Sequence, residues 1–231
     1  MTKRHLIAFL IGCAVAGIAK SEPVKDFVDF VRSVPQPRLS FRTVFHTAPR
    51  AMVMEGEFPV CSATVEGDAI YTAGHCVRGK KEGDEVEVLL QRGSIPIRQT
   101  VYLQEVYSDI AVLSFSKTTK VKPPTAVKVK AGARVVAVMG ILFADDPDVY
   151  RASLPYFERE GKVLAVFTAK EIGMTNLLPD ISPTAEFALI DIGSFGGNSG
   201  SGVYLIDEQG KRHLIGVVSA GVSDYTVVAL F

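Results

Sequence analysis

The chain has 231 residues and no formal net charge, because 25 lysines and arginines balance 25 aspartates and glutamates. Apolar residues make up 48% of the sequence and charged residues 22%, which excludes an intrinsically disordered chain. Without a basic excess, the composition gives no support to nucleic-acid binding. The length fits one large domain or two small ones.

Residues 1–19 have the features of a secretory signal peptide. Lys3 and Arg4 precede an apolar run at 6–19 that ends in small residues. As a helix this run reaches about 21 Å, short of the roughly 30 Å hydrocarbon core, so we expect cleavage and no stable membrane span in the mature form. The expected location is secreted or periplasmic. Cys13 lies in a segment similar to a bacterial lipobox, so a lipid anchor at this residue is the alternative.

Residues 20–42 form the next predicted unit, an N-terminal helix and linker. Apolar residues in 24–32 follow helical spacing, and Pro35 and Pro37 end the pattern. We interpret this segment as a short amphipathic helix packed on the domain. A pro-segment and a membrane-surface helix are the alternatives.

From about residue 43 the sequence changes to short strands separated by turns, which predicts an all-β fold of barrels or a sandwich. A polar, proline-rich linker at 117–127 separates two regions, 43–116 and 128–231. The predicted strands are 60–65, 69–72, 85–91, 97–106 and 110–115 in the first region, and 134–139, 161–167, 185–190, 202–206, 213–218 and 226–231 in the second.

Two cysteines, Cys61 and Cys76, remain after removal of the signal peptide. An even pair in an exported chain indicates a disulfide, here closing a loop of about 15 residues. Two small buried thiols are the alternative.

The strongest motif is the glycine-rich segment 196–202 around Ser199. Glycines on both sides allow a tight turn and the close approach of a substrate carbonyl. The amides of Gly197 and Ser199 would then form an oxyanion hole. Such a segment is also typical of a simple tight turn, and it lacks the spacing of a phosphate-binding loop.

A serine nucleophile needs a base, and His75 is the best candidate because it follows the predicted strand 69–72 and adjoins Cys76. Asp109 comes directly before an apolar strand, where a carboxylate needs a partner such as an imidazole N–H. Taken singly, these residues are also compatible with an ordinary surface or core histidine and a turn aspartate.

The other two histidines beyond the signal peptide are given no role in chemistry. His213 lies beside a polar hairpin loop predicted at 207–211, and His46 lies in an irregular stretch.

In chain order, the segments TAGHC (72–76), SDIAVL (108–113) and GNSGSG (197–202) resemble the chymotrypsin-fold serine peptidases. The order His, Asp, Ser also differs from that of subtilisins and α/β-hydrolases. The resemblance implies two six-stranded antiparallel β-barrels and hydrolysis of a polypeptide through an acyl-enzyme. It implies neither a metal nor a cofactor, and we expect a monomer.

By this resemblance Ser199 attacks the scissile carbonyl, His75 is the base and Asp109 orients it. Cys61 and Cys76 match the disulfide that lies beside the histidine in the family. The residue before the serine is Asn198, where trypsin-like zymogens have an aspartate. We therefore expect no activation by a salt bridge to a new N-terminus.

The resemblance also places a specificity pocket for the P1 side chain, which precedes the cleaved bond. Its residues would be Gly193 and Ser194 on one side and Ser219, Ala220 and Gly221 on the other. None is charged, so we expect a neutral P1 residue.

Two residues bear on a charged P1 preference. Asp191 lies two residues from the position where a tryptic pocket has its carboxylate, so a basic preference is the alternative. Glutamate-specific relatives have a histidine at the position of Val218, which this chain lacks.

The sequence therefore predicts an exported serine endopeptidase. A catalytically silent binding module on the same fold is one alternative. A viral-type polyprotein-processing peptidase, with the N-terminal apolar segment internal to a larger precursor, is the other.

Overall fold

The computed structural model describes residues 50–140, 154, 156–171, 175, 181–222 and 224–231. The expected signal peptide, Cys13, the helix at 24–32 and His46 lie outside these residues. Within them, no helix has the length and apolar sequence needed to cross a bilayer.

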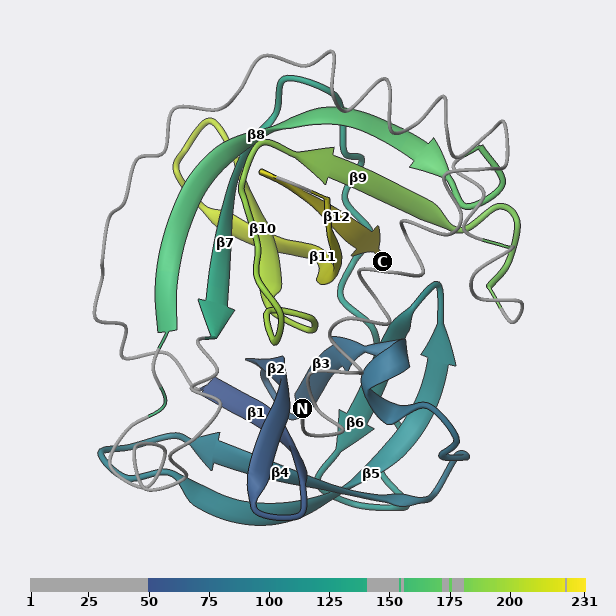
Figure 1. Ribbon diagram of the computed structural model, residues 1–231, viewed down its shortest axis with the longest axis vertical. Coiled ribbons are helices and arrows are strands. Elements are labelled where there is room, and N and C mark those ends of the chain that lie inside the picture. The colour runs from purple at the N-terminus through teal and green to yellow at the C-terminus, as the bar shows by residue number, and fades with distance from the viewer. Residues whose placement is uncertain (1–49, 141–153, 155, 172–174, 176–180, 223) are drawn as a thin grey trace, which may run out of the picture.

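Two closed antiparallel barrels of six strands each make up the fold, one above the other in Figure 1. The first contains Arg50–Glu55 (β1), Phe58–Glu66 (β2), Ala69–Ala73 (β3), Glu85–Gln91 (β4), Ile97–Tyr107 (β5) and Ile110–Ser114 (β6). The second contains Arg134–Gly140 (β7), Tyr156–Thr168 (β8), Glu186–Ile190 (β9), Gly202–Ile206 (β10), Arg212–Val222 (β11) and Tyr225–Leu230 (β12). The predicted all-β class with two six-stranded barrels is confirmed.

Strand order is the same kind of closed circuit in both halves. The neighbours run β1-β2-β3-β6-β5-β4 in the first barrel and β10-β11-β12-β9-β8-β7 in the second, and β4 pairs again with β1. Closure leaves no unpaired sheet edge in either barrel. A single turn of 3-10 helix, Gly74–Val77 (η1), follows β3.

Two strands differ from the sequence prediction. β1 is absent from the predicted set, because Arg50–Glu55 is short, contains only one β-branched residue and lacks strict alternation. β8 begins at Tyr156, five residues before the predicted start at Gly161. The prediction missed these residues because they include the charged pair Glu158 and Arg159, which is typical of a loop. Both of these charged residues are only 6% exposed.

β3 and β6 are buried along their whole length because each has a barrel interior on one side and the other barrel on its opposite side. Side chains of a strand alternate between the two faces. Ile70 and Leu113 accordingly pack inside the first barrel, whereas Tyr71 and Val112 pack against the second. This sandwiching explains why both strands are continuously apolar, and it fixes their ends at the junction of the two barrels.

Candidate active site

The antiparallel pairing of β3 with β6 brings His75 and Asp109 together. Ala73, at the end of β3, is opposite Ile110, at the start of β6. His75 comes two residues after Ala73, and Asp109 comes one residue before Ile110. Register alone therefore places two residues that are 34 positions apart at one end of the barrel.

The Asp109 carboxylate, 4% exposed, accepts hydrogen bonds from three groups. The Nδ1 atom of His75 lies 3.0 Å from Oδ2 and 3.2 Å from Oδ1, and the His75 backbone amide donates to Oδ1 at 2.9 Å. The Ser219 hydroxyl donates to Oδ2 at 2.5 Å. Because a carboxylate only accepts, Nδ1 carries the proton, and the Nε2 of a neutral His75 keeps its lone pair for another donor.

The backbone at this corner adopts conformations that few residues tolerate. Ser108 and Asp109 have φ of 50° and 60°, in the left-handed region, which costs free energy for residues with a Cβ. The Asp109 carbonyl accepts the amide of Gly74 at 2.8 Å. A Cβ at Gly74 would lie 2.9 Å from a Val106 methyl and 3.2 Å from the Asp109 backbone, so only glycine allows this approach.

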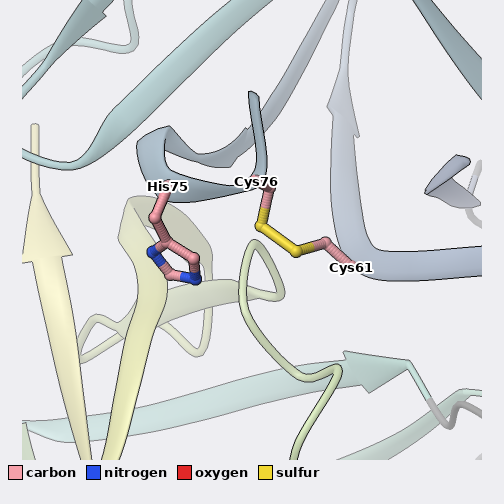
Figure 2. A group of neighbouring side chains, drawn as sticks. All are labelled: Cys61, His75 and Cys76. Atoms are coloured by element: carbon pink, nitrogen blue, oxygen red, sulfur yellow. A yellow bond between two sulfur atoms is a disulfide. The ribbon is translucent and has the colours of Figure 1, made fainter. Parts of the chain in front are cut away.

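A disulfide fixes the turn that carries His75. Cys76 is bonded to Cys61 of β2, the pairing expected from the sequence, with the two Cα atoms 6.2 Å apart. Figure 2 shows the imidazole and the disulfide beside one another on the turn after β3. His75, Cys61 and Cys76 are also the one described group of potential metal ligands that converges. A metal site there is unsupported, because both sulfurs are committed to the disulfide and thiolates are the metal-binding form.

The loop that carries Ser199 connects β9 to β10 and is braced from within by Asn198. The Asn198 side chain, in a residue only 2% exposed, accepts the amide of Phe195 at 2.7 Å and donates to the carbonyl of Gly140 at 2.5 Å. Both ends of this neutral amide thus have partners inside the second barrel. These bonds agree with the expectation that no N-terminal ammonium is needed there.

The same loop is held against the first barrel on either side of Ser199. The Gly197 carbonyl accepts the amide of Ser62 at 3.1 Å and its hydroxyl at 2.8 Å. A Cβ at Gly200 would overlap the Ser62 carbonyl oxygen and the Thr72 hydroxyl, and would lie 3.0 Å from the Thr72 Cα. Since Thr72 precedes His75 by three residues, the half-buried Ser199 lies in a loop that is docked beside the histidine-bearing strand.

The residues expected to form the specificity pocket fall on two facing segments. A Cβ at Gly221 of β11 would lie 2.8 Å from the Ser194 hydroxyl, so the two walls are close together. Ala220 and Ser219 precede Gly221 on the same strand, and Ser219 reaches the Asp109 carboxylate. Asp191 does not point into this space as a free acid, because its carboxylate accepts the backbone amide of Lys162.

One charged residue near that pocket has no signal in the sequence. Arg159 of β8 donates from Nη1 to the carbonyl of Gly193 at 3.0 Å. It lies 34 residues before Gly193, and only the pairing of the strands brings the two together. Because residues 156–160 are not predicted to form a strand, no sequence pattern places Arg159 near the pocket.

His213 has a structural role in the hairpin between β10 and β11. Its Nε2 lies 2.9 Å from the Asp207 carboxylate, which also accepts the amides of Gln209 at 3.0 Å and Lys211 at 2.8 Å. The hydrogen bond to His213 is the main cause of a lowered Asp207 pKa. The hydrogen bond to Asp207 therefore explains His213 without a catalytic role.

Solved structures of serine proteases share this fold. Rv3671c from Mycobacterium tuberculosis H37Rv, as an inactive serine-to-alanine mutant, is 18% identical with a TM-score of 0.50, covering 80% of this chain and 81% of its own. A human pathogenic astrovirus serine protease is 12% identical with a TM-score of 0.50, covering 84% of this chain and 96% of its own. No family model and no curated protein matches the sequence. The fold is thus the two-barrel fold of chymotrypsin-type serine proteases, the fold that the three sequence motifs imply.

Proposed function

We propose that the protein is an exported serine endopeptidase that cleaves polypeptides through Ser199, His75 and Asp109. The observation that carries this proposal is the buried Asp109 carboxylate, bonded to His75 Nδ1 and to Ser219. Burying a carboxylate costs free energy unless it is hydrogen-bonded or paired. Here its hydrogen bonds fix an imidazole in one tautomer. That tautomer suits a base whose Nε2 receives a proton from a hydroxyl.

The chemistry follows the roles of these groups. The Ser199 hydroxyl attacks the substrate carbonyl while His75 Nε2 takes its proton, and Asp109 stabilises the resulting imidazolium. His75 then protonates the leaving amine as the C–N bond breaks, leaving an acyl-enzyme on Ser199. Water, deprotonated by the same histidine, hydrolyses the ester and restores the serine.

An oxyanion hole from the amides of Gly197 and Ser199 fits the conformation of the loop. Gly197 has a φ of 91°, and its carbonyl is held by Ser62. Within the described part of the chain, neither amide donates to a backbone carbonyl. Fixed amides at this position would stabilise the charge that develops on the substrate oxygen, typically worth about 3 kcal/mol for each donor.

Export is proposed on two grounds. The apolar run at 6–19 after Lys3 and Arg4 has the organisation of a signal peptide. The Cys61–Cys76 disulfide is of the kind that persists in oxidising compartments. Mass spectrometry of the mature N-terminus tests this part: an N-terminus close to residue 20 supports export, whereas cleavage out of a longer precursor supports the polyprotein alternative.

The expectation of a neutral P1 residue rests on Gly193, Ser194, Ser219, Ala220 and Gly221 alone. Arg159, which reaches the carbonyl of Gly193 from β8, adds a charge to their surroundings.

A fluorophosphonate probe tests the catalytic proposal. It should label the wild-type protein covalently, and Ser199→Ala should lose both labelling and cleavage of an unfolded protein. Ser94→Ala, at an exposed serine between β4 and β5, is the matched control and should retain both. A folded wild-type protein that is never labelled would favour the catalytically silent binding module.

A further inference from the structure

Arg159 occupies an unusual place for a charged side chain. It lies in the first half of β8, opposite Ala137 of β7, and is only 6% exposed. Burial lowers the pKa of its guanidinium, yet arginine stays charged in proteins. Burying a cation costs free energy unless it has hydrogen-bond acceptors or anionic partners, so the surroundings of Arg159 indicate its role.

Those surroundings are the base of the expected P1 pocket. The position that a Cβ of Gly193 would occupy lies 3.6 Å from Nη1 of Arg159, and Nη1 itself donates to the Gly193 carbonyl. Because Gly193 has no side chain, none lies between its backbone and the guanidinium. Gly193 and Ser194 form one wall, and Gly221 lies directly across from Ser194.

Two aromatic rings hold the guanidinium in this place. Its central carbon lies 5.0 Å from the centroid of the Phe157 ring and 5.2 Å from that of Phe195. Cation–π contacts of this kind orient an arginine without neutralising its charge. Phe195 belongs to the loop that carries Ser199, so the cation is fixed to the same segment as the nucleophile.

We propose that Arg159 selects substrates with an acidic P1 residue, glutamate or aspartate, by binding the side-chain carboxylate at the base of this pocket. The inference rests on the proposed peptidase function and refines it. A guanidinium has five N–H donors in a planar fork, enough to hold the Gly193 carbonyl and other partners together with a carboxylate. An acidic P1 preference of this kind does not require a histidine at position 218, because Arg159 supplies the positive charge from a different strand.

This proposal replaces the neutral P1 residue expected from the pocket walls. The walls are uncharged, but the guanidinium at the base is a positive charge that an acidic P1 side chain can pair with and a neutral one cannot. It also disfavours the basic alternative, since a lysine or arginine side chain would meet like charge, and the Asp191 carboxylate is engaged by the Lys162 amide.

The test compares peptides that differ only at P1, with Glu, Gln, Asp, Asn, Leu or Lys. We expect kcat/KM for Glu or Asp to exceed that of its amide by roughly 10- to 100-fold, the range for a charge-assisted hydrogen bond. Arg159→Gln should bring this acid-to-amide ratio close to one, and Arg159→Lys should retain an intermediate ratio. Arg134→Gln is the matched control, because Arg134 is an exposed arginine of β7 paired with Glu160 at 3.5 Å, and it should keep the wild-type ratio.

The outcomes separate this inference from the peptidase proposal. If the fluorophosphonate labels Ser199 but the wild-type acid-to-amide ratio is close to one, the acidic preference is wrong and the peptidase proposal stands. A ratio that persists in Arg159→Gln assigns the preference to other residues and overturns the role of Arg159. If Arg159→Gln does not fold, the wild-type and Arg159→Lys ratios decide. A folded wild-type protein without labelling overturns both proposals.

Discussion

The Ser219 hydroxyl and the Asp109 carboxylate, 110 residues apart in the chain, share a 2.5 Å hydrogen bond that links the second barrel to the first. Both residues are buried, with 5% and 4% exposure. The carboxylate is therefore positioned by each barrel at once: by His75 from its own barrel and by Ser219 from the other. The geometry of the site depends on how the barrels dock.

Removal of this hydroxyl should affect stability and activity together. We expect Ser219→Ala to lower the free energy of unfolding by about 1.5–3 kcal/mol, the usual value of a hydrogen bond to a charged group. The loss in kcat/KM should be smaller than that of Asp109→Asn, because both bonds from His75 remain. Chemical denaturation and peptide hydrolysis measure the two effects. Ser94→Ala should change stability by less than about 0.5 kcal/mol; an equal change in both variants would contradict the role of the inter-barrel bond.

Asp109→Asn should leave the fold in place and remove most of the activity. All three groups bonded to the carboxylate are donors, so the amide NH₂ of asparagine faces a donor whichever way it is turned. His75 is then driven into the tautomer whose Nε2 carries the proton, which cannot accept one from Ser199. We expect kcat/KM to fall by about a thousandfold to ten-thousandfold.

The control for this variant is Asp68→Asn, at an exposed aspartate in the turn between β2 and β3. It should behave as the wild type in peptide hydrolysis. Full activity in Asp109→Asn would remove the carboxylate from the proposed mechanism.

Local sequence patterns were enough to predict most strands and the three motifs, because apolar alternation and glycine-rich turns act over a few residues. The turn at Ser108–Asp109 is also local in this sense, whereas the close approach of Gly74 to Asp109 depends on the pairing of β3 with β6. What the sequence could not predict depends on neighbours far along the chain. β3 and β6 are buried on both faces only because the second barrel covers them, and Arg159 reaches Gly193 only through the packing of β8.

β8 shows the physical reason for such a failure. Its first half contains two buried charged residues, Glu158 and Arg159, which in isolation favour a solvated loop. In the fold, Glu158 is paired with Arg212 through two hydrogen bonds of 2.6 and 3.1 Å, and Arg159 is held by Gly193 and two aromatic rings. Tertiary partners make these charges compatible with a buried strand, and no local pattern contains them.

Gly200→Ala should be far more destabilising than an ordinary glycine substitution. Gly200 has a φ of 87°, and an added Cβ would overlap backbone and side-chain atoms of Ser62 and Thr72. We expect a loss of at least about 2 kcal/mol, together with displacement of the Ser199 loop and loss of probe labelling.

Gly210→Ala is a matched control for this substitution. Gly210 has a similar φ of 79°, but in the hairpin after Asp207, where a Cβ would meet nothing within 4 Å. This variant should incur only the backbone strain, about 1 kcal/mol, with normal labelling. Thermal melts of the two variants measure the difference, and equal losses would show that contact with the first barrel contributes nothing.

The pairing of Asp207 with His213 should make stability depend on pH in a defined direction. The pKa of Asp207 lies below its ordinary value of 3.8 in the folded protein, chiefly through the hydrogen bond from His213. A carboxyl with a lowered folded pKa contributes stability above its unfolded pKa and loses it as the pH falls through the folded value. The difference in melting temperature between the wild type and Asp207→Asn should therefore be full well above pH 3.8 and shrink below it. A difference that is constant across this range would contradict the assignment.

The Cys61–Cys76 disulfide should stabilise the fold and hold the His75 turn in place. It closes a loop with a sequence separation of 15 residues, which corresponds to about 3 kcal/mol in the chain-entropy description. We expect the Cys61→Ala/Cys76→Ala double variant to unfold at lower denaturant concentration and to hydrolyse peptides more slowly, because η1 then loses its covalent tie to β2. Dithiothreitol should lower the stability of the wild type to a similar extent and leave the double variant unchanged. A shift of equal size in both proteins would mean that the reductant acts elsewhere and that this bond does not stabilise the turn.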